Sequence, residues 1–175
     1  MIISVERAKT LIDLNGWTDA KIEMKLKAIE QTIRAYTNNN FQDRGHRIQA
    51  SIVNGMLESE SEIPFNVGDT VQVSESKLNN GLYMILGISG NATFTVSDDL
   101  KDEDIVLVTK IVYPADVVEC CLDLLEWSKE FGGKVGIKSE TISRHSVTYE
   151  DSATLFMGYP VGILNGLKLR KKARF

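Results

Sequence analysis

A stretch of helical periodicity between residues 114 and 131 constrains the fold most strongly. Apolar side chains recur there at steps of three and four residues: Val117, Val118, Cys121, Leu122, Leu125 and Phe131, with Leu124 beside them. The spacing predicts a helix with one wide apolar stripe and an acidic opposite face. Pro114 suits the first turn, and Gly132-Gly133 is a typical C-cap. Because so wide a stripe must be buried, residues 114–133 are predicted to form the central core helix.

Two helices are predicted before it, within residues 1–41. Apolar residues from Val5 to Leu14 indicate a short first helix that includes Leu11 and is closed by Asn15-Gly16. Thr18 or Asp19 caps a second helix, which runs to about Tyr36 and is broken by the asparagines that follow. The second helix carries a narrow apolar seam: Ile22, Leu26, Ile29, Ile33 and Tyr36. Such a seam packs against another helix, either in the same subunit or in a neighbouring one.

Residues 42–113 change to a period of two, which is typical of strands. About five short strands are predicted, at Arg47–Ile52, Val67–Val73, Leu82–Leu86, Asn91–Val96 and Ile105–Val112. An acidic connection, Asp98–Asp104, joins the last two. Strands at this spacing favour a small barrel-like block. Since the helical parts are each too small to bury their stripes alone, we expect them to pack together with this block inserted between them.

Residues 134–175 are predicted to be a C-terminal arm. Residues 138–149 resemble two short extended segments, and Pro160 can begin a short helix with Ile163, Leu164 and Leu167 on one side. A basic tail with interleaved apolar residues follows. It can be a solvated, frayed end or a segment that docks into a groove. The fold class is therefore α+β, with a small helical core, an inserted β-barrel-like block and an extended C-terminal arm.

Composition narrows the functional classes. No apolar run reaches the roughly 18–20 residues of a membrane span, and the N-terminus does not resemble a signal peptide. Cys120 and Cys121 are adjacent in a helix, which disfavours a framework disulfide and indicates a reducing compartment. The net charge is −4, and without the five cations of the basic tail the remainder carries about −9. Such an acidic body repels duplex DNA at long range.

Residues with catalytic or metal-binding chemistry do not cluster in the sequence. His46 and His145 lack partners at metal-ligand spacing, and the two cysteines fit small buried apolar residues. The Asp98–Asp104 connection lacks the glycine and closing glutamate of a calcium loop. No glycine-rich phosphate loop is present. The prediction is a protein that is not an enzyme and needs no metal or cofactor.

One alternative function concerns the β block. Val67–Val73 followed by Asn80–Ile85 resembles the strand-turn-strand pattern of SH3-like barrels, some of which bind nucleic acid. Between residues 53 and 112 the only basic residues are Lys77, Lys101 and Lys110, and acids outnumber them. A nucleic-acid-binding module is therefore the second hypothesis.

The order of the elements resembles the head–tail connector (adaptor, or head-completion) proteins of long-tailed bacteriophages. The resembling residues are Ala28–Asn38 with Phe41, Pro114–Phe131 with its Leu-Leu-Glu-Trp, Ser139–Ile142, Val147–Tyr149, Gly158–Pro160 and Ile163-Leu164. The inserted β block is a departure, since compact members of the family lack it.

The resemblance implies a virion protein of the phage neck, made in the host bacterial cytoplasm. It implies a ring, commonly of about twelve copies, that sits under the portal, continues the DNA channel and supports the next neck or tail protein. DNA would pass through without sequence-specific binding, and no membrane is involved. The portal-binding stretch would lie within Gly158–Phe175: Tyr159, Pro160, Ile163, Leu164, Leu167, Lys168, Arg170, Lys171, Lys172, Arg174 and Phe175.

Overall fold

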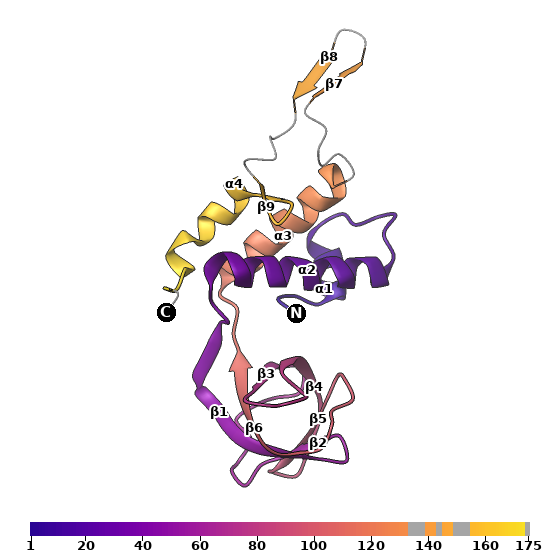
Figure 1. Ribbon diagram of the computed structural model, residues 1–175. Coiled ribbons are helices and arrows are strands. Elements are labelled where there is room, and N and C mark those ends of the chain that lie inside the picture. Colours follow the sequence, from indigo (N-terminus) through magenta and orange to yellow (C-terminus); the bar gives the residue numbers. More distant parts are fainter. Residues whose placement is uncertain (133–138, 143–144, 149–154, 174–175) are drawn as a thin grey trace. The chain divides into compact units, whose positions relative to one another are not determined.

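The computed structural model describes residues 1–132, 139–142, 145–148 and 155–173. The chain divides into two compact units: a helical unit, Met1–Asn39 with Tyr113–Phe175, and a barrel unit, Asn40–Val112 (Figure 1). The predicted boundaries after residues 41 and 113 lie close to these divisions. The mixed α+β class and the predicted barrel-like block are confirmed, since the block is a closed barrel.

The helical unit is built around two long helices. Its elements are α1 (Val5–Leu11), α2 (Asp19–Thr37), α3 (Ala115–Phe131), the hairpin β7 (Ser139–Ile142) with β8 (His145–Thr148), the pair β9 (Leu155–Phe156) with β10 (Tyr159–Pro160), α4 (Val161–Leu164) and the 3₁₀ helix η2 (Asn165–Arg170). Helix α2 packs against α3, and α4, η2 and β10 pack against α3. Within the described ranges, no helix combines the length and hydropathy that a membrane span needs.

Local sequence signals set the ends of α2. The Thr18 hydroxyl accepts a hydrogen bond from the Lys21 backbone N–H at 3.4 Å, as an N-cap residue does. Asn38 ends the helix in the left-handed conformation, with φ of 48°. Between them, the predicted seam residues Ile22, Leu26, Ile29 and Ile33 are completely buried.

Helix α3 contacts α2, α4, η2 and β10, and its buried face is rotated from the predicted stripe. The buried residues are Val117, Cys120, Cys121, Leu124, Leu125 and Ser128. The predicted stripe residues Val118 and Leu122 are only half-buried, and Phe131 is 37% exposed. Cys120 contacts Ile163 of α4 and Ser128 contacts Tyr159 of β10, and a stripe predicted from large apolar residues misses such small ones. Gly132 is the C-cap residue of α3, as predicted, with φ of −59°, and Gly133 lies outside the described residues.

Two further predictions for the helical unit are corrected. Helix α1 ends at Leu11, which is 53% exposed, while Leu14 is buried in the connection beyond the helix. A loop residue can supply core contacts without helical spacing, so periodicity alone placed Leu14 wrongly. The arm predicted to be extended is compact over residues 155–173, where α4 and η2 pack on α3.

The barrel closes through six strands in the order β1-β2-β5-β4-β3-β6. They are β1 (Gln42–Val53), β2 (Met56–Glu58), β3 (Thr70–Ser74), β4 (Gly81–Ser89), β5 (Thr93–Val96) and β6 (Glu103–Ile111). Strand β2 has only three residues, too few to show a period of two, so the prediction of five strands missed it. Val67, predicted within a strand, lies before β3 and is 61% exposed.

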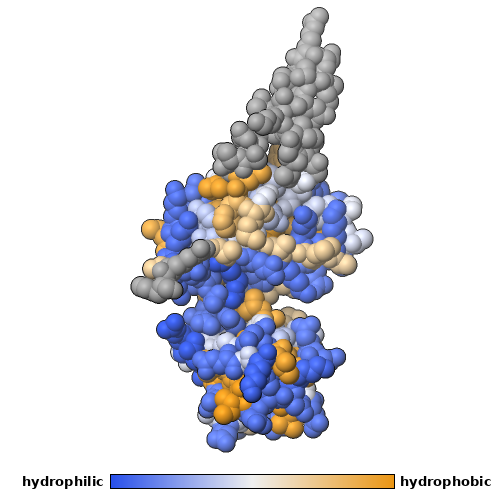
Figure 2. Space-filling view, in the orientation of Figure 1, coloured by the Kyte–Doolittle hydropathy of each residue, from blue (hydrophilic) through white to orange (hydrophobic). Residues whose placement is uncertain are grey.

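The interior of the barrel is apolar. Phe94 is completely buried and meets Phe65 edge-to-face, with ring centroids 5.8 Å apart. Alternate residues of the strands supply the rest of this core, including Val71, Val73 and Val106. Apolar residues also form separate patches on the outer surface, among hydrophilic ones (Figure 2).

Candidate docking surfaces

The C-terminal segment, defined as residues 155–173, packs on the two long helices of its own unit. It begins with the β9–β10 pair, in which Tyr159 opposes Phe156. Tyr159 is 7% exposed, and its ring centroid lies 6.0 Å from that of Trp127 on α3. This burial raises the pKa of the Tyr159 hydroxyl. Pro160 is buried as well and serves as the N-cap residue of α4.

Leu164 and Leu167 anchor the segment. They are 0% and 1% exposed and belong to α4 and η2, which contact α3. Ile163 is half-buried, and its carbonyl accepts a hydrogen bond from Cys120 Sγ at 3.9 Å. Ile163, Leu164 and Leu167, which were predicted to share one side of a helix, therefore contact α3 of the same chain.

An ion pair joins the end of η2 to the start of α3. Arg170 Nε and Nη2 lie 2.8 and 3.1 Å from the two Asp116 carboxylate oxygens. Arg170 lowers the pKa of Asp116, and Asp116 raises the pKa of Arg170. Both side chains remain about 40% exposed, at 43% and 40%, so solvent screens much of the attraction.

The last described residues are tied to the end of α2. The Lys172 backbone N–H donates to the Thr37 carbonyl at 2.8 Å, and Asn38 Nδ2 donates to the Ala173 carbonyl at 3.1 Å. Lys171 Nζ lies 3.8 Å from the centre of the Tyr36 ring, a cation–π contact. These contacts favour docking over fraying as far as Ala173.

The predicted portal-binding residues therefore fall into three groups. Tyr159, Pro160, Leu164 and Leu167 are buried in the helical unit, with Ile163 half-buried. Lys168, Arg170, Lys171 and Lys172 are exposed, and Arg174 and Phe175 lie outside the described residues. Leu169, which the prediction did not include, is 98% exposed between the lysines. The part of the C-terminal segment that a partner can contact is therefore a basic face centred on Leu169.

The predicted packing seam of α2 is used within the chain. Its four aliphatic residues are completely buried, and α2 packs against α3. Tyr36 is half-buried, donates its hydroxyl hydrogen to Asn165 Oδ1 at 3.0 Å and meets Phe156 edge-to-face at 5.5 Å. Tyr36 therefore links the seam to the C-terminal segment.

The two cysteines and His46, which the sequence offers for chemistry, lie in separate elements, α3 and β1. Burial raises the pKa of both cysteine thiols to about 12, which keeps Cys120 and Cys121 protonated. His46 lies 2.7 Å from the Asp43 carboxylate at the exposed start of β1. Among the described residues, no three His, Cys, Asp or Glu side chains are grouped to hold a metal.

Glu30, Arg34 and Tyr113 form a polar cluster that was not predicted from the sequence. The Tyr113 hydroxyl donates to Glu30 Oε1 at 2.5 Å, and Arg34 donates to the same hydroxyl at 3.4 Å. Burial and the neighbouring carboxylate raise the pKa of Tyr113. Glu30 is only 4% exposed on α2. Because the partners of Glu30 are Tyr113, 83 residues away in the sequence, and the N-terminal amine of Met1, spacing could not reveal the cluster.

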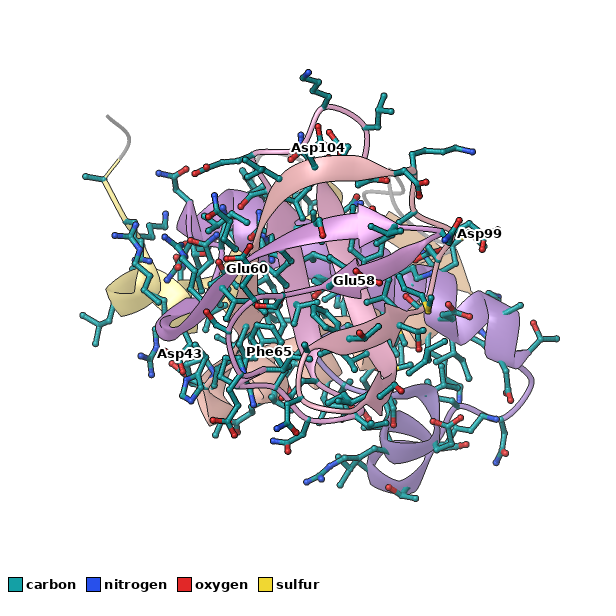
Figure 3. The ribbon with its side chains drawn as sticks, turned by 90° about the horizontal axis from the view of Figure 1, so that it is seen from below. Asp43, Glu58, Glu60, Phe65, Asp99 and Asp104 are labelled. Atoms are coloured by element: carbon teal, nitrogen blue, oxygen red, sulfur yellow. The ribbon has the colours of Figure 1, made fainter. Side chains whose placement is uncertain are left out.

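Charge is divided unevenly between the two units. The barrel unit has eleven acidic and five basic residues, a net charge of −6, whereas the helical unit carries +2. Acids come from several parts of the barrel, as Asp43, Glu58, Glu60, Asp99 and Asp104 show in Figure 3. Of its basic residues, Lys110 forms an ion pair with Asp69 at 2.6 Å.

Comparison with protein-family models gives no match, and comparison with curated proteins gives no relative.

Proposed function

We propose that the protein is a head–tail connector of a tailed bacteriophage. Copies form a ring beneath the portal, continue the DNA channel and offer a platform to the next neck protein. In this proposal α1, α2 and α3 form the helical core of the ring, the barrel is an insertion, and the C-terminal segment presents the face that contacts the portal. Its place is the neck of the virion.

The observation that carries the proposal is the C-terminal segment. Leu164 and Leu167 fix it to the helical unit, so its outer face is held in place before any partner binds. That face presents Leu169, 98% exposed, between Lys168 and Lys172. A pre-ordered segment loses little conformational entropy on binding, which favours a docking role. The portal contact is therefore assigned to the exposed residues of Lys168–Phe175.

The charge of the barrel supports a connector over the nucleic-acid-binding alternative. A net charge of −6 repels the phosphate backbone, which suits DNA that must pass without sticking. The alternative depends on Lys77 and Lys110, and of these Lys110 is paired with Asp69. We keep the connector as the single proposed function.

The test is attachment to immobilised portal rings from the same phage. The Leu169→Asp variant should bind at least about tenfold more weakly, because it puts a charge where an apolar side chain would be buried. The matched control is Leu11→Asp on α1, where the leucine is 53% exposed. Deleting Lys168–Phe175 should abolish attachment while circular dichroism stays helical. Equal binding by wild type, Leu169→Asp and the deletion would refute the proposal.

A further inference from the structure

A pocket on the barrel combines apolar and acidic side chains. It has a volume of about 610 Å³ and lies beside β6 and the connection from β3 to β4. Its lining includes Val53, Leu78 and Ile105, which are 40%, 70% and 61% exposed. Glu75, Asp102 and Asp104 add carboxylates, and Lys77 is the only base in the lining. Figure 3 shows Asp104 at the edge of the barrel. We call this the barrel pocket.

Hydrogen bonds to Glu103 hold the loop that carries Leu78. The Glu103 carboxylate accepts from the Ser76 hydroxyl, the Lys77 backbone N–H at 2.7 Å and Asn79 Nδ2 at 2.6 Å. The Leu78 backbone N–H donates to Ser76 Oγ at 3.1 Å. Each of residues 76–79 therefore takes part in a hydrogen bond that orders the loop, and the Leu78 side chain is exposed on it. A leucine that is 70% exposed on an ordered loop is suited to contact with another molecule.

The pocket selects a partner of particular chemistry. Three exposed apolar groups favour an apolar side chain, and carboxylates around them favour positive charge beside it. The outer face of α2 has this combination. Met24 is 66% exposed at its centre, and Lys21, Lys25 and Lys27 surround it. Since α2 is a helix of 19 residues, this face is already ordered.

We propose that the barrel pocket of one copy receives the α2 face of a second copy, with Met24 against Leu78 and Ile105. The contact rests on the proposed function, because it supplies the subunit interface of the ring. Two different surfaces of the same chain meet in it, so the contact is heterologous and repeats around a ring.

The C-terminal segment is the weaker candidate for this pocket. Arg170 is paired with Asp116, and Lys171 lies on the Tyr36 ring of its own unit. Lys168, Leu169 and Lys172 remain exposed, but the proposed function already assigns them to the portal contact. On α2, Lys21 lies 4.3 Å from the centre of the Trp17 ring and Lys27 pairs with Glu23 at 2.9 Å. Lys25 has no such partner among the described residues, so its charge is the one available to a second copy.

Disulfide trapping between two variants tests the contact. One protein carries Leu78→Cys, the other Met24→Cys, and they are mixed under mild oxidation. Cys120 and Cys121 do not interfere, because they are buried and their thiols stay protonated. The matched control replaces Leu78→Cys by Leu86→Cys, on β4, where the leucine is 54% exposed outside the pocket. Trapping should be about tenfold faster for the Leu78 pair, and slower at high salt.

A charge exchange sharpens the result. Asp104→Lys on the Leu78→Cys protein should slow trapping, and Lys25→Glu on the Met24→Cys protein should restore it. Rates equal to those of the Leu86 control would overturn the contact. Faster trapping of Leu78→Cys by a Leu169→Cys protein would overturn it too, because the occupant would be the C-terminal segment.

Portal attachment separates this inference from the proposed function. The reduced Leu78→Cys and Met24→Cys proteins retain Leu169, so both should attach to portal rings. Attachment without trapping overturns the α2–barrel contact alone. Trapping without attachment, in these variants and in wild type, supports the contact between copies and overturns the connector.

Discussion

Replacing Leu167 by alanine should destabilise the helical unit by about 2–5 kcal/mol. Leu167 is 1% exposed in η2, which packs against α2 and α3. The change removes buried methyl groups and leaves a cavity unless the segment shifts to fill it. A value near the lower end would mean that the C-terminal segment relaxes toward the helices.

Arg170→Ala provides the comparison that decides which interaction anchors the segment. Arg170 and Asp116 remain 43% and 40% exposed, so water screens their attraction. We expect Arg170→Ala to change the free energy of unfolding much less than Leu167→Ala does. Leu169→Ala is the surface control, since Leu169 is 98% exposed and should change stability by no more than about 0.5 kcal/mol.

Tryptophan fluorescence during guanidinium unfolding is the assay. Trp17 and Trp127 are the only tryptophans, and both belong to the helical unit, so the barrel does not contribute. Trp127 also contacts Tyr159 and therefore senses the C-terminal segment directly. A loss below about 1 kcal/mol for Leu167→Ala, or a larger loss for Arg170→Ala, would refute apolar anchoring.

Three further predictions concern groups outside this contact. Hydrogen bonds, above all the one from Ser76, hold the pKa of Glu103 below its ordinary value of 4.5, so the ionised carboxylate stabilises the barrel above pH 4.5 and this stabilisation is lost as the pH falls through the lower pKa of the folded state. Glu103→Gln should remove this pH dependence from the free energy of unfolding, measured from about pH 7 to pH 3. Iodoacetamide should label Cys120 and Cys121 only after denaturation, as mass spectrometry would detect; labelling of the native protein would contradict their burial. Lys110→Ala should destabilise the barrel by about 1 kcal/mol or more, because Asp69 loses its partner, and it should not change the mobility of DNA mixed with the protein on a gel. If wild-type protein retards the DNA and the variant does not, the result would support the nucleic-acid alternative.

The sequence predicts features that depend only on residues within one or two helical turns, such as the ends of α2. Thr18 caps α2 through the N–H three residues later, and Asn38 ends it in a left-handed conformation. The aliphatic seam between them is buried because its spacing matches the helix period. The change to a period of two likewise predicted the barrel-like block, since that pattern depends only on neighbouring residues.

Features that depend on distant partners were not readable. The buried face of α3 includes Cys120 and Ser128, whose small size matters only once neighbouring elements are in place. Leu164 and Leu167 were predicted to lie on one side of a short helix, but periodicity does not reveal that the surface they pack against is α3 of the same chain. The Glu103 network joins residues 24 to 27 positions apart in the sequence. Such contacts follow from barrel closure, which local spacing does not encode.

Electron microscopy of portal rings mixed with this protein tests the central claim most directly. The account predicts an added ring of density beneath the portal, coaxial with its channel, that disappears when Lys168–Phe175 is deleted. Portal images unchanged by an excess of the wild-type protein would contradict it.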